Sequence, residues 1–506
     1  MASPDVHKTD AHETSAPATA GAAERLRRAV LAPLAALKRD YVPLLMIYFA
    51  YGALGIVAVA DSFWLKKTLS LSAVEIAQLG VWLTLPWAIK MVFGELVDTV
   101  PILGSQRRAY VFIGAGLIAL SLLMLAGAAG GWLTFASPDR IYIAASLLSV
   151  TGVVLQDVVA DAMSTEVVPR TLADGTPRPQ EEIDHDLGMV QVLGRLALSI
   201  GIFATAGLAG ALAQALPYEK VFLIGLVVPA ISMSGALLVK LDTRETRPTD
   251  WRLLGAGLAF GTLVTALLAA DIPYAQEIVL VISLAVIVTM LAHVTADMAA
   301  ETRQRIVYAA LIIFAFRAVP GPGEGYHWFT IDKLGFDEAF FGVLGQIGAG
   351  LSLAAMWLLS DSITNQPIAR VLLVLTLAGA ALSLPDVSLV FGLHEWTEQT
   401  FGFGARTIAL VDTVAQSPLD QLSMIPLLTL IAIYAPPAKR AIWFALMASF
   451  MNLALVTGQL MTRYLNELYV VERGAYDALP ALYVTMLALK LVIPLAAIAV
   501  FGRKVR

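Results

Sequence analysis

Cysteine is absent from this sequence of 506 residues, and charged residues are scarce. Without cysteine the chain can form neither a disulfide nor a thiolate metal site. Asp, Glu, Lys and Arg together make up 14% of the residues, against about 25% in a typical soluble protein. By contrast, 58% of the residues are hydrophobic and the mean hydropathy is +0.76. This composition indicates a polytopic membrane protein.

Several features that would indicate other classes of protein are also missing. The first twenty residues contain no apolar segment, so we expect no cleavable signal peptide. The chain has six histidines, no clustered metal ligands and no glycine-rich phosphate loop, so we expect no enzyme activity, no cofactor and no metal. The net charge of −5 is too small to indicate a nucleic-acid partner.

Residues 1–40 are expected to form a cytoplasmic tail outside the membrane core. Their first half is polar and is predicted to be disordered. The stretch ERLRRAVLAPLAALKRD that follows mixes basic and apolar residues, and anionic lipid would attract its arginines and lysines. We therefore predict an amphipathic segment that lies on the membrane surface.

Fourteen apolar stretches are long enough to cross a membrane, which takes about 20 mostly apolar residues. They lie near residues 42–64, 74–97, 109–130, 139–165, 188–214, 219–240, 252–270, 274–296, 305–330, 338–360, 367–385, 405–435, 438–462 and 477–501. An even number of spans places both termini on one side. Lysine and arginine are concentrated in the connections on that side, which predicts an inner (cytoplasmic) membrane protein with both termini in the cytoplasm.

Two stretches of the sequence align without a gap at an offset of 265 residues (314 minus 49). They are Phe49–Gly80 and Phe314–Gly345, and the match places the first span opposite the ninth. It divides the chain into an N-terminal half (41–241), a central insert with two extra spans (242–304) and a C-terminal half (305–502). Two six-helix bundles in pseudo-twofold repeat are the arrangement of the major facilitator fold, which we therefore predict.

The fourth predicted span carries acids at a depth where a charge costs at least about 2.5–3.5 kcal/mol. Asp157 and Asp161 are four residues apart and so share a helix face. Counting helical turns places Lys90, Arg195 and Gln191 at the same depth. We predict a hydrated passage in which the two acids carry a coupling proton and the other three residues bind an anion. Alternatively, the cluster only holds helices together.

The ninth predicted span contains a break. Arg317 is followed by PGPGEG (Pro320–Gly325), which cannot continue a regular helix. We predict a gate at Pro320 and Pro322, with Arg317 facing an anionic substrate and Glu324 taking part in proton coupling; the alternative is a kinked helix end. Polar side chains in two later spans are further candidates for substrate binding: Asp420 and Asn452.

The connection between the second and third spans reads GELVDTVPILGSQRR (Gly94–Arg108). It resembles the facilitator signature Gly-x-x-x-Asp, which is followed by a turn and paired basic residues. Gly94 would permit a close helix approach, and Asp98 would pair with Arg107 and Arg108. We predict that these ion pairs break as the two halves rock, so that the four residues act in gating.

Four parts of the chain together resemble the folate–biopterin transporters of the major facilitator superfamily. They are PWAIKMVFGELVDTVPILGSQRRAY (Pro86–Tyr110), QDVVADAMSTEVV (Gln156–Val168), LGFDEAFFGVLG (Leu334–Gly345), and MIPLL with FALMASFMN (Met424–Leu428 and Phe444–Asn452). The resemblance implies a proton-coupled transporter of folates, pterins or similar anions, with Lys90, Asp157 and Asp161 at the charged positions of that family. The two extra spans depart from it, as does the basic pair at 439–440, where the family has an acidic residue.

We therefore expect a secondary active transporter that moves a small organic anion together with protons by alternating access. Membrane lipid is an expected partner, and protein partners stay unknown. Two other functions stay open. The chain could be a membrane assembly factor or scaffold of the same fold that transports nothing, or it could export an unrelated anion or a lipid.

Overall fold

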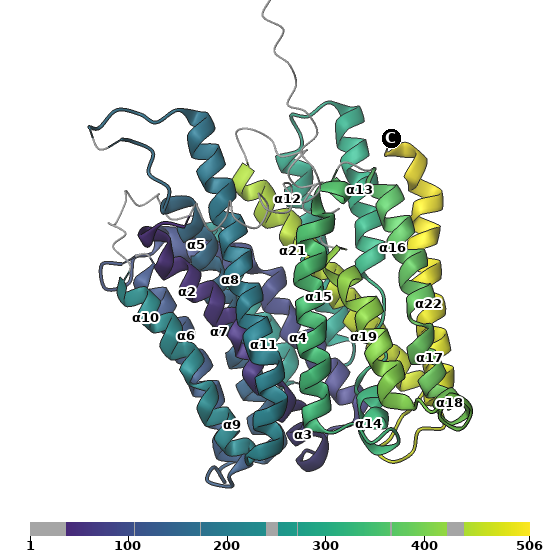
Figure 1. Ribbon diagram of the computed structural model, residues 1–506. Helices are drawn as coiled ribbons and strands as arrows, with labels where there is room; N and C mark the ends of the chain where they lie inside the picture. The colour runs from purple at the N-terminus through teal and green to yellow at the C-terminus, as the bar shows by residue number, and fades with distance from the viewer. Residues whose placement is uncertain are drawn as a thin grey trace, which may run out of the picture. The chain divides into compact units, whose positions relative to one another are not determined.

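The computed structural model describes residues 37–505 except 106, 173, 239–250, 271, 365–366 and 423–439. The chain from Lys38 onward forms one compact unit. Its regular secondary structure, in the part that is described, consists of helices, with β-bridges only as isolated pairs (Figure 1). The predicted all-α class is confirmed. The amphipathic tail predicted for 1–40 falls almost wholly outside the described residues.

The N-terminal half builds six membrane-length segments from shorter helices. The first joins α2 (Val42–Ala53) and α3 (Ala58–Thr68) through the 3₁₀ helix η2 (Leu54–Val57). The other helices of this half are α4 (Ala73–Ala88), α5 (Lys90–Thr99), α6 (Arg108–Ala129), α7 (Pro138–Glu166), α8 (Gln180–Ala215), α9 (Tyr218–Gly225) and α10 (Val227–Leu238). Helices α4 and α5 form one span, as do α9 and α10.

The remaining helices belong to the central insert and the C-terminal half. The insert contributes α11 (Trp251–Ala269) and α12 (Ala275–Val294). The C-terminal half contains α13 (Ala300–Arg317), α14 (Glu324–Asp332), α15 (Glu338–Thr364), α16 (Ile368–Leu382), α17 (Leu384–Val390), α18 (Leu393–Phe401), α19 (Ala405–Leu422), α21 (Arg440–Leu468) and α22 (Leu479–Phe501). Helix α11 packs on α5 and α12 packs on α21, so the insert contacts both halves.

Eleven segments of the described chain are long and apolar enough to cross a membrane, and each coincides with a predicted span. The other three predicted spans differ. Helix α11 contains only a shorter apolar run, Leu254–Val264. The span near 305–330 is broken between α13 and α14, and the span near 405–435 lies partly outside the described residues. A total of fourteen therefore stays a prediction.

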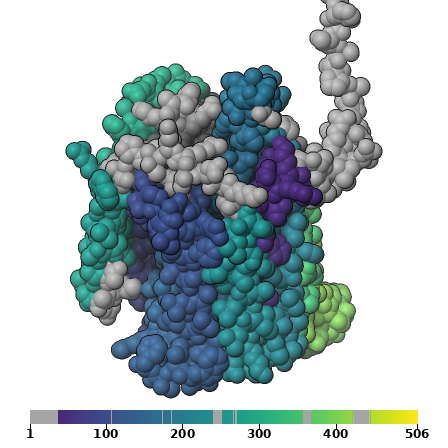
Figure 2. All heavy atoms as spheres, turned by 90° about the vertical axis from the view of Figure 1, so that its left-hand side faces the viewer, coloured from purple at the N-terminus to yellow at the C-terminus, as the bar shows by residue number. Residues whose placement is uncertain are grey.

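The face of the N-terminal half that is turned to the viewer in Figure 2 includes the outer sides of α6, α9 and α10. Helices α6 and α10 expose large apolar side chains: Ile113, Leu120, Leu123, Val227, Leu237 and Leu238. A soluble protein would bury such a surface, because water disfavours contiguous apolar patches. The pattern is that of helices whose outer sides lie in a membrane.

The two halves meet along two pairs of helices, α8 with α15 and α4 with α21. We call the end with α3, α9 and α14, opposite the C-terminus in Figure 1, the distal end. Ion pairs cross between the halves at this end: Lys66 pairs with Asp332, and the Lys67 Nζ lies 2.8 Å from Glu338 Oε1. The hydroxyl of Tyr218 also donates to Glu338 at 2.8 Å. In the described structure, these interactions therefore hold the two halves together at the distal end.

Candidate functional site

The side chain of Lys90 bridges two carboxylates of α7. Its Nζ lies 2.5 Å from Asp157 Oδ2 and 2.6 Å from Asp161 Oδ2. One ammonium reaches both acids because residues four apart lie on the same face of a helix. The Tyr48 hydroxyl donates to Asp161 Oδ1 at 3.0 Å. We call Lys90, Asp157, Asp161 and Tyr48 the Lys90 cluster.

The two acids of the Lys90 cluster differ in their exposure to solvent. The side chain of Asp161 is 48% exposed, whereas that of Asp157 is 13% exposed. Arg195 is exposed and lies within electrostatic range of Asp157, but it forms no ion pair with a described residue. Two carboxylates therefore share one closely bound cation. Such a site can take up a proton on either acid, or exchange one of them for the carboxylate of a ligand.

A helix break places Lys90. Pro86 lacks a backbone N–H, so it cannot continue the hydrogen-bond ladder of α4. The helix ends at Ala88, Ile89 leaves the helical conformation, and α5 starts at Lys90. Asn452 of α21 donates its Nδ2 to the carbonyl oxygen of Trp87 at 3.0 Å. This predicted substrate ligand thus bonds across the two halves to the backbone at the break.

Two aromatic rings lie beside the charges. Tyr51 of α2 and Trp87 of α4 stack with their ring centroids 6.1 Å apart and their planes 25° apart, and both are half-buried. Tyr51 lies within electrostatic range of Asp157 and Lys90. Charges next to an accessible aromatic surface suit a flat, charged ligand. The sequence analysis did not identify Tyr48, Tyr51 or Trp87. The three-residue spacing of Tyr48 and Tyr51, which places both on one helix face, is a signal for these two residues.

A sequence model of the BT1 family matches residues 52–503. The chain belongs to the BT1 family. It is 26% identical over 464 residues to the "Folate-biopterin transporter" of Synechocystis sp., covering 90% of this chain and 80% of that protein. It is 22% identical over 462 residues to the "Probable folate-biopterin transporter 4" of Arabidopsis thaliana, covering 85% and 89%. The resemblance to folate–biopterin transporters is confirmed.

Solved transporter structures share the fold of this BT1-family chain. A crystal structure of a POT family transporter in complex with 5-aminolevulinic acid matches with a TM-score of 0.65 at 14% identity, covering 92% of this chain and 97% of that one. A crystal structure of a mutant of the nucleoside transporter NupG matches with a TM-score of 0.58 at 13% identity, covering 92% and 100%. The major facilitator fold is confirmed, and the BT1-family chain is a multi-pass membrane transporter, not an enzyme.

The predicted gating loop is held within the N-terminal half. Arg107 is buried, and its Nη2 lies 2.7 Å from Asp98 Oδ1 and 2.6 Å from Glu166 Oε1. Its Nη1 donates to the carbonyl oxygen of Val97 at 2.8 Å. Arg108, by contrast, is exposed. Glu166 is a partner that the loop motif does not contain, and the breaking of these pairs during transport stays a prediction.

The reason given for Gly94 is wrong. Among the described residues, a Cβ atom added to Gly94 would have no neighbour within 4 Å. Gly94 therefore permits no close approach of a described helix in this structure. Its role in gating stays a prediction.

We expect Arg107→Ala to lower the free energy of unfolding by about 3 kcal/mol, because it removes a buried cation that binds Glu166, and the lower end of the range for a broken buried pair applies because Asp98 is 45% exposed. Arg108→Ala, at an exposed neighbouring position, should change it by no more than about 0.5 kcal/mol. Thermal unfolding of both purified variants in one detergent measures the difference. Equal melting temperatures would show that the Arg107 pairs contribute nothing to stability.

The break predicted in the ninth span is present. Helix α13 ends at Arg317 and α14 starts at Glu324. The break packs on α21, where Gly321 N–H donates to Thr462 Oγ1 at 2.9 Å. Gly323 has φ +72°, and a Cβ there would lie 2.6 Å from Asn466 Nδ2. Glycine is required at this position on both counts. Pro320 and Pro322 lie inside the break, and their role as a gate stays a prediction.

The repeat also relates this break to the first span. The offset of 265 residues places η2, where α2 passes into α3, on residues 319–322. Both halves thus interrupt their first helix at the same register, which the residue matches alone did not indicate.

Three other residues are predicted to bind substrate. Gln191 is exposed and donates to Ser164 Oγ at 2.6 Å. Arg317 is half-buried at the end of α13. The side chain of Asp420 lies outside those that the structure describes. Their roles in substrate binding stay predictions.

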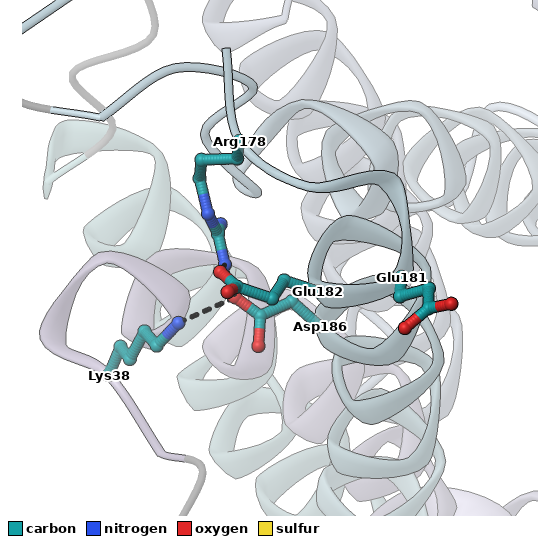
Figure 3. A pocket seen from close by; sticks show the side chains of 5 residues that line it. All are labelled: Lys38, Arg178, Glu181, Glu182 and Asp186. Atoms are coloured by element: carbon teal, nitrogen blue, oxygen red, sulfur yellow. Dashed lines mark hydrogen bonds and ion pairs between the residues drawn. The ribbon is translucent and has the colours of Figure 1, made fainter. Parts of the chain in front are cut away.

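A pocket of about 380 Å³ lies where α8 begins (Figure 3). It is lined by Lys38, Arg178, Glu181, Glu182 and Asp186. Lys38 Nζ lies 2.8 Å and Arg178 Nη2 lies 3.1 Å from Asp186 Oδ2. The hydrogen bond to Asp186 raises the pKa of Lys38 against the smaller, opposite effect of its burial. All five lining side chains are charged and none is aromatic, so we do not assign a flat, charged ligand to it.

Proposed function

We propose that this BT1-family chain transports a small planar organic anion, such as a folate or a pterin, together with protons by alternating access. The observation that carries the proposal is one ammonium, Lys90, held between Asp157 and Asp161 beside the stacked rings of Tyr51 and Trp87. The names of the relatives in Synechocystis and Arabidopsis favour the same substrate class.

The substrate and the proton act on the same cluster. Lys90 is engaged by two carboxylates, so an incoming anion must compete with them for the ammonium. A proton on either acid removes one negative charge and weakens that competition. Asp161 is the more exposed acid and the first to meet solvent protons. Protonation thus prepares Lys90 for the carboxylate of a substrate, while Tyr51 and Trp87 offer their faces to its ring.

Alternating access requires the distal end to open and close. The pairs of Lys66 with Asp332 and of Lys67 with Glu338 join the two halves there and must break for opening. In the proposed orientation, within an inner (cytoplasmic) membrane and with cytoplasmic termini, the distal end is the outer one. The structure then corresponds to the state that has closed toward the outside.

Uptake into vesicles with an imposed pH gradient tests the proposal, with labelled folate and a pterin compared against succinate, an anion without a ring. We expect Asp157→Asn to lower accumulation of the ring-bearing anions about tenfold in a gradient of about one pH unit and to remove its dependence on the gradient, because an amide cannot bind and release the coupling proton and about 1.4 kcal/mol of driving force corresponds to a tenfold ratio. The variant Asp174→Asn, at an exposed loop position, is the matched control.

Two results would contradict the proposal. If Asp157→Asn accumulates substrate with the native pH dependence, the acid has no part in proton coupling. If succinate is taken up as well as the folate and the pterin, the rings of Tyr51 and Trp87 do not select the substrate.

A further inference from the structure

A second pair of acids lies at the distal end, outside the Lys90 cluster, with one acid on each half. Asp61 belongs to α3 and Glu324 to α14, and the two carboxyl groups lie within electrostatic range of each other. Asp61 Oδ1 and Glu324 Oε2 are buried, and neither has a hydrogen-bond partner. The other oxygen of Asp61 accepts from the Tyr142 hydroxyl of α7 at 3.2 Å. Asp61 was not among the residues that the sequence indicated.

The nearest cations are already engaged. Arg473 acts on Glu324 from a distance, but its Nη2 donates to the carbonyl oxygens of Leu65 and Leu71 at 3.3 and 3.0 Å. Its guanidinium also lies over the Trp328 ring, 4.6 Å from the centroid.

Two further groups lie on the helices that carry the two acids, His327 on α14 and Lys66 on α3. His327 has a buried Nε2 without a partner, and its ring packs against Phe63 and Phe341. Lys66 acts on His327 by charge but pairs with Asp332. Within the described residues, neither Asp61 nor Glu324 forms an ion pair.

Two ionised carboxylates in this position would be costly. Removing a carboxylate from water without a partner costs several kcal/mol, and a second negative charge nearby adds to that cost. A buried acid escapes the cost by binding a proton. The closed distal end therefore suits a site that holds at least one proton, and opening it to water removes the reason to hold that proton.

We propose that Asp61 and Glu324, with the Tyr142 hydroxyl bound to Asp61, form a proton-binding site between the two halves that keeps the distal end closed while it is protonated. The site deepens the proposed function by giving proton release a direct mechanical effect, but its operation does not depend on which substrate is carried. The closed state binds more protons than the open state, so rising pH favours opening and falling pH favours closure.

The absence of native cysteine gives a direct test. Arg140 and Asp477 are exposed at the distal end, in the N-terminal and the C-terminal half respectively. Spin labels on Arg140→Cys and Asp477→Cys, in phosphatidylcholine nanodiscs without substrate, report the distance between the halves. We expect the ratio of open to closed molecules to rise with pH, by up to about tenfold per pH unit for one proton. With Asp61→Asn and Glu324→Gln together, the ratio should no longer change with pH.

Controls separate this site from others. Glu472→Gln removes an exposed carboxylate at the same end and should keep the native response. The infrared band of a protonated carboxyl group, measured on the native chain and on each single variant, gives a second readout that does not depend on the labels. The proposal is overturned if the native distance does not respond between about pH 5 and pH 9, or if the double variant responds as the native chain does. A pH response without uptake of folate or pterin would leave this site standing and contradict only the proposed substrate.

Discussion

Replacement of Lys90 by methionine is expected to lower the free energy of unfolding by about 3 kcal/mol and to abolish uptake. The methionine removes the only cation that pairs with Asp157 and Asp161 among the described residues, and two carboxylates are left one turn apart. Loss of one partner of a buried pair costs about 3–5 kcal/mol, and the lower end applies because Asp161 is 48% exposed. Thermal unfolding in detergent and vesicle uptake measure the two effects.

A double variant distinguishes stability from function at this site. Lys90→Met combined with Asp157→Asn removes one charge of each sign, so most of the lost stability should return while uptake stays absent. Lys220→Met, at an exposed position of α9, is the matched control and should affect neither. If Lys90→Met alone unfolds at the native temperature and still accumulates substrate, the Lys90 cluster is neither a structural nor a transport site.

Addition of one methyl group at Gly342 is expected to move the transporter out of its distally closed state. A Cβ there would lie 2.8 Å from the Cα of Gly210 and 3.0 Å from the carbonyl oxygen of Gly207 in α8. These backbone atoms cannot give way without moving the helix, and overpacking of this kind costs about 1–3 kcal/mol. Because only the closed state carries the cost, its population relative to the open state should fall about tenfold for each 1.4 kcal/mol.

The neighbouring Gly345 supplies the control. A Cβ at this position would meet only the Cβ of Ala206, at an ordinary 3.5 Å, so Gly345→Ala should behave as the native chain. The spin-label distance across the distal end should lengthen in Gly342→Ala, and uptake should fall by a similar factor. The same distance and the same uptake in both alanine variants would show that α8 and α15 need no close contact.

Much of the Lys90 cluster could be predicted because helical geometry is local. Asp157 and Asp161 share a face by their spacing alone, and the depth of Lys90 follows from counting turns in an apolar span. The break after Arg317 was predictable for the same reason, since proline and glycine act on their own stretch of backbone. The hydrogen bonds of Asn452 and Gln191 to Trp87 and Ser164 were not predicted, and the roles of both residues in substrate binding stay predictions. The direction in which a single polar side chain points depends on its neighbours in space.

The sequence by itself determined the membrane class, the helical spans, the repeat and the resemblance to folate–biopterin transporters, since hydropathy and local motifs are properties of the chain read in order. Only the tertiary structure decided which residues meet across the halves: Lys66 with Asp332, Gly342 with Gly210, and Asp61 near Glu324. These residues are far apart in the sequence, and the repeat relates equivalent positions of the two halves without showing which side chains meet. Their pairing depends on how α3, α8, α14 and α15 pack, because the packing of helices decides which side chains from distant parts of the sequence become neighbours.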